Sequence, residues 1–152
     1  MYAVEPSTPD RVARIAANLR PADAAEGWSF WGRCPRALTK AAARDSDVSW
    51  VGLKDGEPFC VFGCLAGQVW LVATPVIEAS AMAFLRYSRG YVARMHRMYG
   101  RLWNYVAQNN RVSLAWLRWL GFNIAPAAPA GVFGDAFHYV WLEADYALDV
   151  SA

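Results

Sequence analysis

The sequence predicts one α/β domain with a mixed α+β sheet of six or seven strands and helices on both faces. Three observations lead to this prediction. Strand-like segments between residues 48 and 73 follow one another across tight turns, which indicates an antiparallel meander. A long amphipathic segment then leads into another strand, and this order gives a crossover between parallel strands. A strand–helix–strand unit continues the alternation toward the end of the chain.

The N-terminal third is predicted to be mainly helical. A short strand over residues 2–4 is followed by a helix over residues 9–19, whose first turn Thr8 can cap. Apolar residues at helical spacing place one face of this helix on the core. Two more helices are expected before the second strand, over residues 21–31 and 35–44.

The antiparallel meander is predicted to begin at residue 48. Asp55-Gly56 is a strong signal for the tight turn between its first two strands. The run 58–77 carries no charge, but it contains Gly63 and Gly67, so strands explain it better than a membrane helix. The three strands are expected over residues 48–54, 57–65 and 68–73.

The second half is predicted to hold two helices. The first is long, running from Thr74-Pro75 to about Tyr99, with Thr74 as its cap, and a strand over residues 102–107 follows it. In the second helix, Asn109 or Asn110 can cap the first turn and Gly121 can end the helix. The remaining segments are a short strand at 122–125, a loop at 126–131, a last strand at 136–142 and a flexible tail at about 145–152.

Composition favours a globular protein. A chain of 152 residues with 56% hydrophobic and 18% charged residues can form one packed core, which excludes a disordered protein. Eight Trp, seven Tyr and seven Phe are many rings for this length, so some are expected at a partner contact, although a core can use them too. Three cysteines without a secretory signal indicate a reducing compartment.

Positive charge is concentrated in one part of the chain. The net charge is only +2, yet residues 75–120 hold seven arginines and a single acid, Glu78. Such a stretch can contact DNA phosphates or an acidic partner, and it can also be a solvated face. The candidate contact residues on the long helix are Arg86, Arg89, Arg94 and Arg97.

Residues in and around the second of these helices, the one that follows Asn110, recur at a characteristic spacing. The residues that define it are Asn110, Ser113, Trp116, Gly121 and Phe122. This spacing resembles the second half of the GNAT (GCN5-related N-acetyltransferase) fold. The resemblance implies a tyrosine acting as a general acid one residue after Trp116, where this chain has Leu117. No catalytic residue is therefore expected.

The resemblance also implies a place for acetyl-coenzyme A, at the turn between the fourth strand and the long helix. There the family uses Gln or Arg and two glycines to expose backbone amides to the pyrophosphate. This chain has no glycine from residue 73 to residue 89, and Glu78 would repel the pyrophosphate by roughly 3–4 kcal/mol. No cofactor is expected, and Asn110 would contact acetyl-coenzyme A only in an active enzyme. The degenerate loop residues are Thr74, Pro75, Glu78 and Ser80.

A closer resemblance covers roughly residues 30–143, through the runs 69–75, 84–88 and 104–122. These runs are similar to a family of GNAT-like bacteriophage proteins that includes the small internal virion protein of short-tailed phages. The resemblance implies a non-catalytic virion or assembly protein, made in the host bacterial cytoplasm, that contacts other virion proteins in several copies. Two alternatives stay open, an acyl-CoA-dependent N-acetyltransferase with an atypical loop and a DNA-contacting core protein.

Single residues suggest further contacts. Exposed rings at Trp28, Trp31 and Trp119, with Arg118 beside the last, are predicted to bind a partner protein. The pair at 28 and 31 can instead fill the substrate cleft that such helices cover in true acetyltransferases.

Other polar residues are expected to be structural. Cys60 and Cys64 stand about 13 Å apart along a strand, too far for one zinc ion, so buried thiols are predicted and no metal site. His96 and His138 have no nearby acid in sequence to orient them, which favours structural or surface roles over that of a catalytic base.

Overall fold

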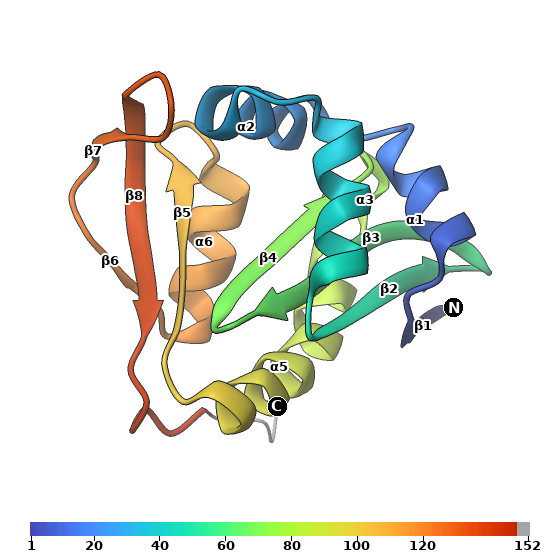
Figure 1. Cartoon of the computed structure of the whole chain (residues 1–152). Coiled ribbons are helices and arrows are strands. Elements are labelled where there is room, and N and C mark those ends of the chain that lie inside the picture. The colour runs from blue at the N-terminus through green and yellow to red at the C-terminus, as the bar shows by residue number, and fades with distance from the viewer. Residues whose placement is uncertain (149–152) are drawn as a thin grey trace.

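A mixed eight-stranded sheet forms the centre of the computed structural model, which describes residues 1–148. Its order is β1-β2-β3-β4-β5-β8-β6, and β7 pairs with β8 (Figure 1). The strands are β1 (Tyr2–Pro6), β2 (Val48–Lys54), β3 (Glu57–Leu65), β4 (Gln68–Ala73), β5 (Leu102–Ala107), β6 (Asn123–Ile124), β7 (Ala128–Ala130) and β8 (Asp135–Leu142). The helices are α1 (Pro9–Ala16), α2 (Pro21–Trp31), α3 (Pro35–Asp45), α4 (Val76–Ala79), α5 (Ala81–Tyr99) and α6 (Arg111–Leu120).

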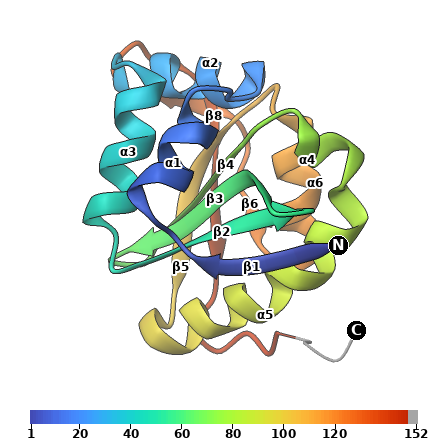
Figure 2. The same cartoon turned by 90° about the vertical axis from the view of Figure 1, so that its right-hand side faces the viewer.

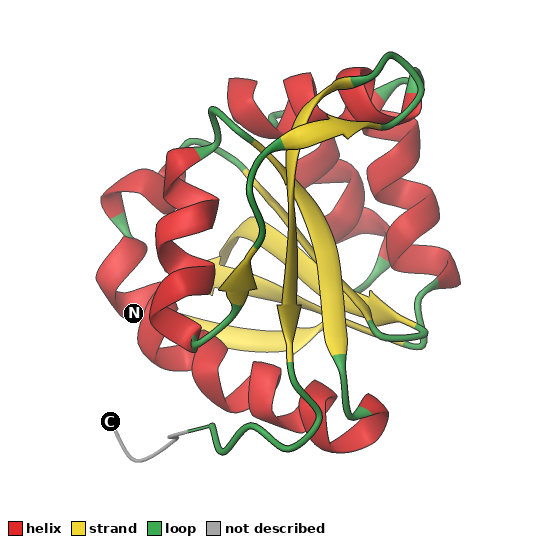
Figure 3. Cartoon of the chain, turned by 90° about the vertical axis from the view of Figure 1, so that its left-hand side faces the viewer, coloured by secondary structure: helices red, strands yellow, loops and turns green. Residues whose placement is uncertain are grey.

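Helices lie on both sides of this sheet, as the sequence predicts. Figure 2 shows α1 and α3 on one side and α4, α5 and α6 on the other, and Figure 3 shows the same layers from the opposite direction. The larger core lies under α5 and α6, where Val92, Met95 and Leu120 are fully or almost fully buried. A smaller core lies under α1, around Ile15 and Val51.

Local signals in the sequence account for most boundaries. The predicted limits of β2, β3, β4 and β5 are confirmed residue for residue. The first hairpin turns at Asp55 and Gly56, whose φ angles of 50° and 82° match the backbone that such turns need. Thr8 caps α1 through its side chain, Asn110 caps α6 in the same way, and Gly121 ends α6 with a φ of 98°.

Two predictions about the fold are wrong. The sheet has eight strands rather than six or seven, because residues 128–130 pair with β8 although the sequence predicts a loop there. Pro129 is compatible with that strand because β7 lies off the main path of the sheet, at an edge.

The long helix is also interrupted. Residues 76–79 form the single turn α4, and α5 begins only after Ser80. Thr74 does not cap either helix, because its side-chain oxygen has no hydrogen-bond partner within residues 1–148 and the cap position of α4 belongs to Pro75. The helix breaks at Ser80, whose N–H donates to the carbonyl of Ile77, three residues back.

The described C-terminal residues contact the core. Leu148 packs against the larger core cluster, and the Tyr146 hydroxyl lies where a Cβ on Gly121 would stand. The expected flexible tail falls partly on residues 149–152, which lie outside the described residues. Within residues 1–148, no helix combines the length and the apolar character that crossing a bilayer requires.

The parallel strands β4 and β5 diverge from a single point of contact. The one register pair between them is Gln68 with Trp103, near the start of both strands. Beyond that pair the strands separate, and α2 lies across the ends of both (Figure 1). The fold therefore contains a wedge-shaped opening in the middle of its sheet.

A substitution at Gly63 tests the close contact between β2 and β3. An added Cβ at this position would lie 2.4 Å from the Val48 carbonyl oxygen, a backbone atom that cannot rotate away. We expect Gly63→Ala to lower the free energy of unfolding by about 2–3 kcal/mol, measured by urea denaturation. The control is Gly90→Ala in α5, where a Cβ meets nothing within 4 Å and should add about 0.5–1 kcal/mol. Equal stabilities of the two variants would contradict the packing described here.

Candidate functional site

Two backbone edges that do not pair with each other face the opening between β4 and β5. The Thr74 N–H donates to Phe59 in β3, so the N–H and C=O of Ala73 point the other way, toward β5. In β5 the Trp103 N–H donates to Gly67, so the N–H groups of Tyr105 and Ala107 point toward β4 by the same alternation. Unpaired edges of this kind are where an extended amide-containing ligand can add itself to a sheet.

Asn104 occupies the narrow end of the opening. Its Nδ2 donates to the Val69 carbonyl at 2.7 Å, and its Oδ1 accepts the Tyr105 N–H at 2.7 Å. The same Oδ1 accepts a bond from Gln68 Nε2 at 3.2 Å. One side chain thus takes the place of the backbone pairing that the diverging strands lose.

Residues at the start of α2 occupy the wide end. Asp23 Oδ2 accepts the Ala73 N–H at 2.9 Å, and the Arg20 N–H donates to the Ala73 carbonyl at 2.8 Å. Glu26 Oε1 accepts the Ala107 N–H at 2.8 Å. The helix therefore bridges β4 and β5 through its own polar groups.

These groups belong to one buried network, which we call the α2 polar cluster: Arg20, Asp23, Glu26, Asn110 and Ser113. Arg20 and Asp23 form a two-pronged ion pair, with both bonds at 3.0 Å and side chains only 3% and 2% exposed. Arg20 also donates to Asn110 Oδ1 at 3.0 Å and to Ser113 Oγ at 3.2 Å. Asn110 Nδ2 donates to Glu26 Oε1 at 2.9 Å, so the cluster joins α2 to the start of α6.

Burial changes the acidity of both carboxylates. Removal from water raises the pKa of Glu26 to about 6, although hydrogen bonds from Asn110 and Ala107 act in the opposite direction. Removal from water also raises the pKa of Asp23, against the opposing effect of Arg20. Hydrogen bonds within the protein stabilise each carboxylate, and water contributes little.

A cleft of about 320 Å³ adjoins the cluster, between the sheet and the helices α2 and α3. Glu26 and Asp23 line it together with the rings of Trp31, Trp70 and Tyr105. Phe30 closes one side, with its ring centroid 5.3 Å from Tyr105 and 5.1 Å from Phe137. The cleft has the mixture of rings and polar groups of a ligand pocket.

Comparison with known proteins identifies the architecture. No protein-family model and no curated protein matches the chain. Among solved structures, the ribosomal-protein-S18-alanine N-acetyltransferase from Escherichia coli is similar, with a TM-score of 0.62, 13% identity and coverage of 97% of this chain and 96% of that one. An acetyltransferase of the GNAT family from Streptococcus pneumoniae gives a TM-score of 0.64, 9% identity and coverage of 94% and 99%. The fold is GNAT-like.

A third neighbour of this GNAT-like fold is yncA, a putative acetyltransferase from Salmonella typhimurium whose structure contains the cofactor acetyl-CoA. It has a TM-score of 0.63 and 15% identity, with coverage of 98% of this chain and 97% of that one. Identities this low establish the common fold alone, since one fold supports many functions. None of these neighbours indicates a bacteriophage origin.

The residues present do not fit a GNAT coenzyme site. Ala73, Tyr105 and Ala107 already use their inward-facing backbone groups, and Asn110 is fully engaged with Arg20 and Glu26. The turn after β4 holds the exposed carboxylate Glu78 and no glycine. Nearby, the buried hydroxyls of Thr74 and Ser80 have no hydrogen-bond partner within residues 1–148. Leu117, at the position of the family tyrosine, is 5% exposed and apolar.

The predicted partner residues lie on two separate surfaces. Trp28 and Trp31 are 52% and 47% exposed on α2. Trp119 is 43% exposed on α6, and the Arg89 guanidinium lies 3.7 Å from the centre of its ring. Arg118, beside it, is exposed. Trp119 therefore already has a partner within the chain, whereas the α2 pair is more open.

The remaining candidates have structural surroundings. His96 is bonded to the Glu143 carbonyl and His138 to the Ala125 carbonyl, both at 2.7 Å. Cys60 and Cys64 are buried, which confirms that prediction, and Cys34 is exposed. No group of three His, Cys, Asp or Glu side chains in residues 1–148 has the arrangement of a metal site.

The α2 polar cluster was missed at the sequence level, although a signal for it exists. Arg20, Asp23 and Glu26 recur at a spacing of three, which places them on one side of a helix that is otherwise mostly apolar or small. The spacing predicts a polar stripe, but it does not reveal that the stripe faces the ends of two strands.

Arg20→Ala tests the buried ion pair. The substitution leaves Asp23 without its cation inside the protein, so we expect a loss of about 3–5 kcal/mol in the free energy of unfolding. The matched control is Arg14→Ala, which removes an exposed ion pair with Glu57 and should cost about 0–1 kcal/mol. Both are measured by chemical denaturation, and a similar small cost for the two would show that the buried pair is not a stabilising centre.

Glu26→Gln tests the raised pKa. The folded state holds the Glu26 proton more tightly than the unfolded chain does. Protonated Glu26 therefore contributes to the free energy of unfolding, most strongly below its ordinary pKa, and this contribution is lost as the pH rises through about 6. Between pH 5 and pH 8 the variant should therefore lose about 1 kcal/mol less stability than the wild type. Urea denaturation at both pH values measures this difference, and parallel losses would contradict it.

Proposed function

We propose that this GNAT-like chain is a binding protein that acts through protein–protein contacts and does not transfer acyl groups in its β4–β5 opening. One observation carries the proposal. The backbone groups of Ala73, Tyr105 and Ala107 that face the opening are bonded to the chain's own groups. An acyl-CoA arm, which is extended and contains amides, would need these same groups.

Opening the site for such a ligand is costly. The arm would have to displace Asp23 and Glu26 from the strand ends, which separates a helix that is tied to β4, β5 and α6 at once. Breaking a buried ion pair alone costs about 3–5 kcal/mol. Glu78 in the preceding turn adds repulsion toward a pyrophosphate. Ligand binding would have to offset all of these contributions.

An exposed apolar surface beside the closed opening supports the contact role. Trp28 and Trp31 belong to α2, and the loop after β7 lies beside the end of this helix and carries Val132 and Phe133, which are 62% and 69% exposed. The Val132 N–H donates to the Phe30 carbonyl at 2.9 Å, and both loop side chains lie near Gly32 at the end of α2. Large apolar side chains grouped in this way mark protein-interaction sites.

The finer expectation, a virion or assembly role in a bacteriophage, stays a prediction. No comparison indicates a bacteriophage origin or a virion location, so neither is part of this proposal. Contacts with DNA or with other copies of the chain likewise stay predictions.

Acyl-CoA-dependent N-acyl transfer is the second candidate, and the comparisons favour it over a virion role. The neighbours named above are acetyltransferases, and one of them contains acetyl-CoA. Within this chain, Glu26 lines the cleft with a pKa of about 6, which suits a general base near neutral pH. The buried hydroxyls of Thr74 and Ser80, which have no hydrogen-bond partner within residues 1–148, have donor and acceptor capacity left for a polar ligand.

Titration with acetyl-CoA separates the two candidates. We expect isothermal titration of the wild-type protein to give no binding in the micromolar range. In the same sample, hydrogen exchange followed by NMR should show slow exchange of the Ala73, Tyr105 and Ala107 amides without ligand, because each is bonded internally. Glu26→Ala is the control, since it should speed exchange at Ala107 while Tyr105 stays slow. Micromolar binding of acetyl-CoA to the wild type would overturn the proposal and establish the second candidate as a coenzyme-binding protein.

A further inference from the structure

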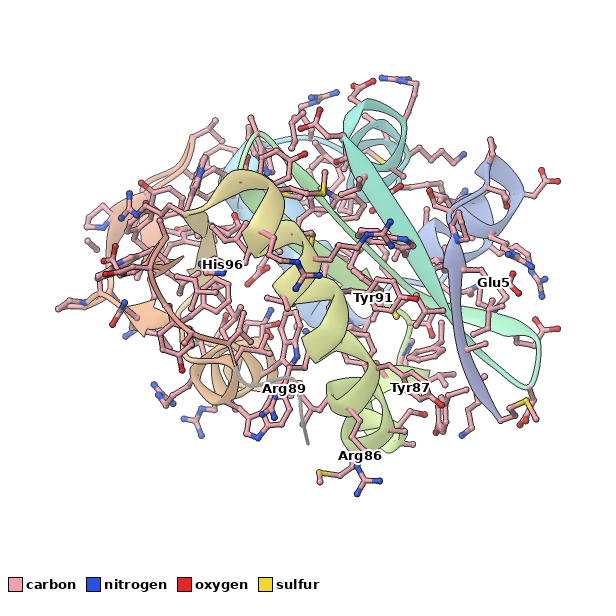
Figure 4. The ribbon with its side chains drawn as sticks, turned by 90° about the horizontal axis from the view of Figure 1, so that it is seen from below. Glu5, Arg86, Tyr87, Arg89, Tyr91 and His96 are labelled. Atoms are coloured by element: carbon pink, nitrogen blue, oxygen red, sulfur yellow. The ribbon has the colours of Figure 1, made fainter. Side chains whose placement is uncertain are left out.

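The outer side of α5 combines exposed arginines, exposed methionines and an exposed glycine. Arg94 also lies 5.5 Å from the centre of the Trp50 ring. Arg86, Arg94 and Arg97 are exposed along α5, at spacings of eight and three residues that keep them on one side of the helix. Figure 4 shows Arg86 directed away from the helix, whereas Arg89 lies toward α6. We call this surface the α5 face: Met82, Arg86, Gly90, Arg94, Arg97 and Met98.

No ion pair within residues 1–148 neutralises the charge on this face. The ion pairs in residues 1–148 involve Arg11, Arg14, Arg20, Arg44 and the N-terminal amine. In that part of the chain, none of the seven arginines between residues 75 and 120 forms one. The cations are therefore available to acidic groups of another molecule.

The composition of the face is that of a protein interface. Met82 and Met98 are 70% and 51% exposed, and Tyr87, also on α5, is 47% exposed. Interface centres are enriched in Met, Arg and aromatic residues and depleted in Lys, Asp and Glu. The α5 helix contains no Lys, Asp or Glu. A nucleic-acid surface would more commonly mix Lys with Arg and would have less use for exposed methionines.

Gly90 lies in the middle of the face. Glycine in a helix interior costs about 0.5–1 kcal/mol relative to alanine. An added Cβ at Gly90 meets nothing within 4 Å, so packing inside this chain does not require the glycine. A residue without a side chain lets a neighbouring backbone approach closely. Helices that pack with their axes about 8 Å apart use small residues at the crossing point for this reason.

We propose that the α5 face binds an acidic helical segment of a partner protein, which crosses α5 at Gly90 and places carboxylates against Arg86, Arg94 and Arg97. The proposal rests on the binding role proposed above and adds the surface and the chemistry of the partner. From Met82 to Met98 the helix rises about 24 Å, so a partner helix of about four to five turns spans the face. Its apolar side chains pack on Met82 and Met98.

Binding of a designed peptide tests the proposal. The probe is a fluorescent helical peptide of about 18 residues, with Glu on one side and Ala and Leu on the other. Its control replaces every Glu by Lys, and a duplex DNA of similar length is the competing polyanion. Fluorescence anisotropy with the full-length protein should show binding of the acidic peptide, no binding of the basic peptide and weaker binding of DNA.

Two variants locate the site. Arg86→Glu with Arg97→Glu should weaken peptide binding at least about tenfold. Arg33→Glu with Arg36→Glu, the same charge change on exposed residues of another surface, should leave binding within about threefold. Gly90→Leu should raise the melting temperature, because leucine favours a helix and meets open space, and yet weaken binding at least about tenfold.

Each contrary result overturns the proposal. If the acidic peptide does not bind, the proposed acidic partner is wrong. If the two pairs of arginine substitutions weaken binding equally, binding depends on the net charge of the protein and not on the α5 face. Tighter binding of DNA that survives Gly90→Leu makes the face a nucleic-acid surface instead. None of these results depends on acetyl-CoA, so failure here is distinguishable from failure of the proposed function, which the coenzyme titration decides.

Discussion

The buried ion pair between Arg20 and Asp23 is the interaction on which the centre of this molecule depends. Parallel strands that diverge leave backbone groups without partners, and such groups must find hydrogen bonds elsewhere. Asp23 satisfies the end of β4, and Arg20 links that aspartate to the cap residue of α6, Asn110. Because the two charges are paired and hydrogen-bonded, their removal from water is compatible with a stable core. The position of α2 follows from these bonds.

This arrangement explains how a GNAT-like architecture can contain diverging strands whose edges are bonded to side chains of the same chain. Asn104 and the α2 polar cluster supply side-chain partners along both sides of the wedge. The cleft beside it is lined by rings and by two acids with raised pKa values, so a small polar ligand can still enter from the α2–α3 side. The β4–β5 opening and the cleft between α2 and α3 are separate sites. The first bears on acyl-CoA binding and the second on binding of a small polar ligand.

The sequence was informative wherever a local signal determined the backbone. Asp55-Gly56, Thr8 and Asn110 each mark a turn or a cap by their own chemistry, and the elements around them have the predicted positions. The break at Ser80 and the strand β7 were not predicted, although both rest on nearby contacts: the Ser80 N–H donates to Ile77, and β7 pairs with β8 directly after a short loop. Neither segment has a turn or cap residue as distinctive as those three. For the site, the sequence shows directly that the turn after β4 has no glycine. It does not show the role of Glu26, because Glu26 accepts a hydrogen bond from the Ala107 amide in β5, which is distant in sequence.

The three thiols differ in a way that has practical value. Cys60 and Cys64 are buried in β3, and burial raises their pKa values to about 12 and about 11, whereas Cys34 is exposed at the start of α3. Backbone N–H groups of Ala37 and Arg36 lower the pKa of the Cys34 thiol. A maleimide dye would thus attach at one position of the natural sequence, beside the cleft and the exposed tryptophans of α2, and would report on ligands there without any engineered cysteine.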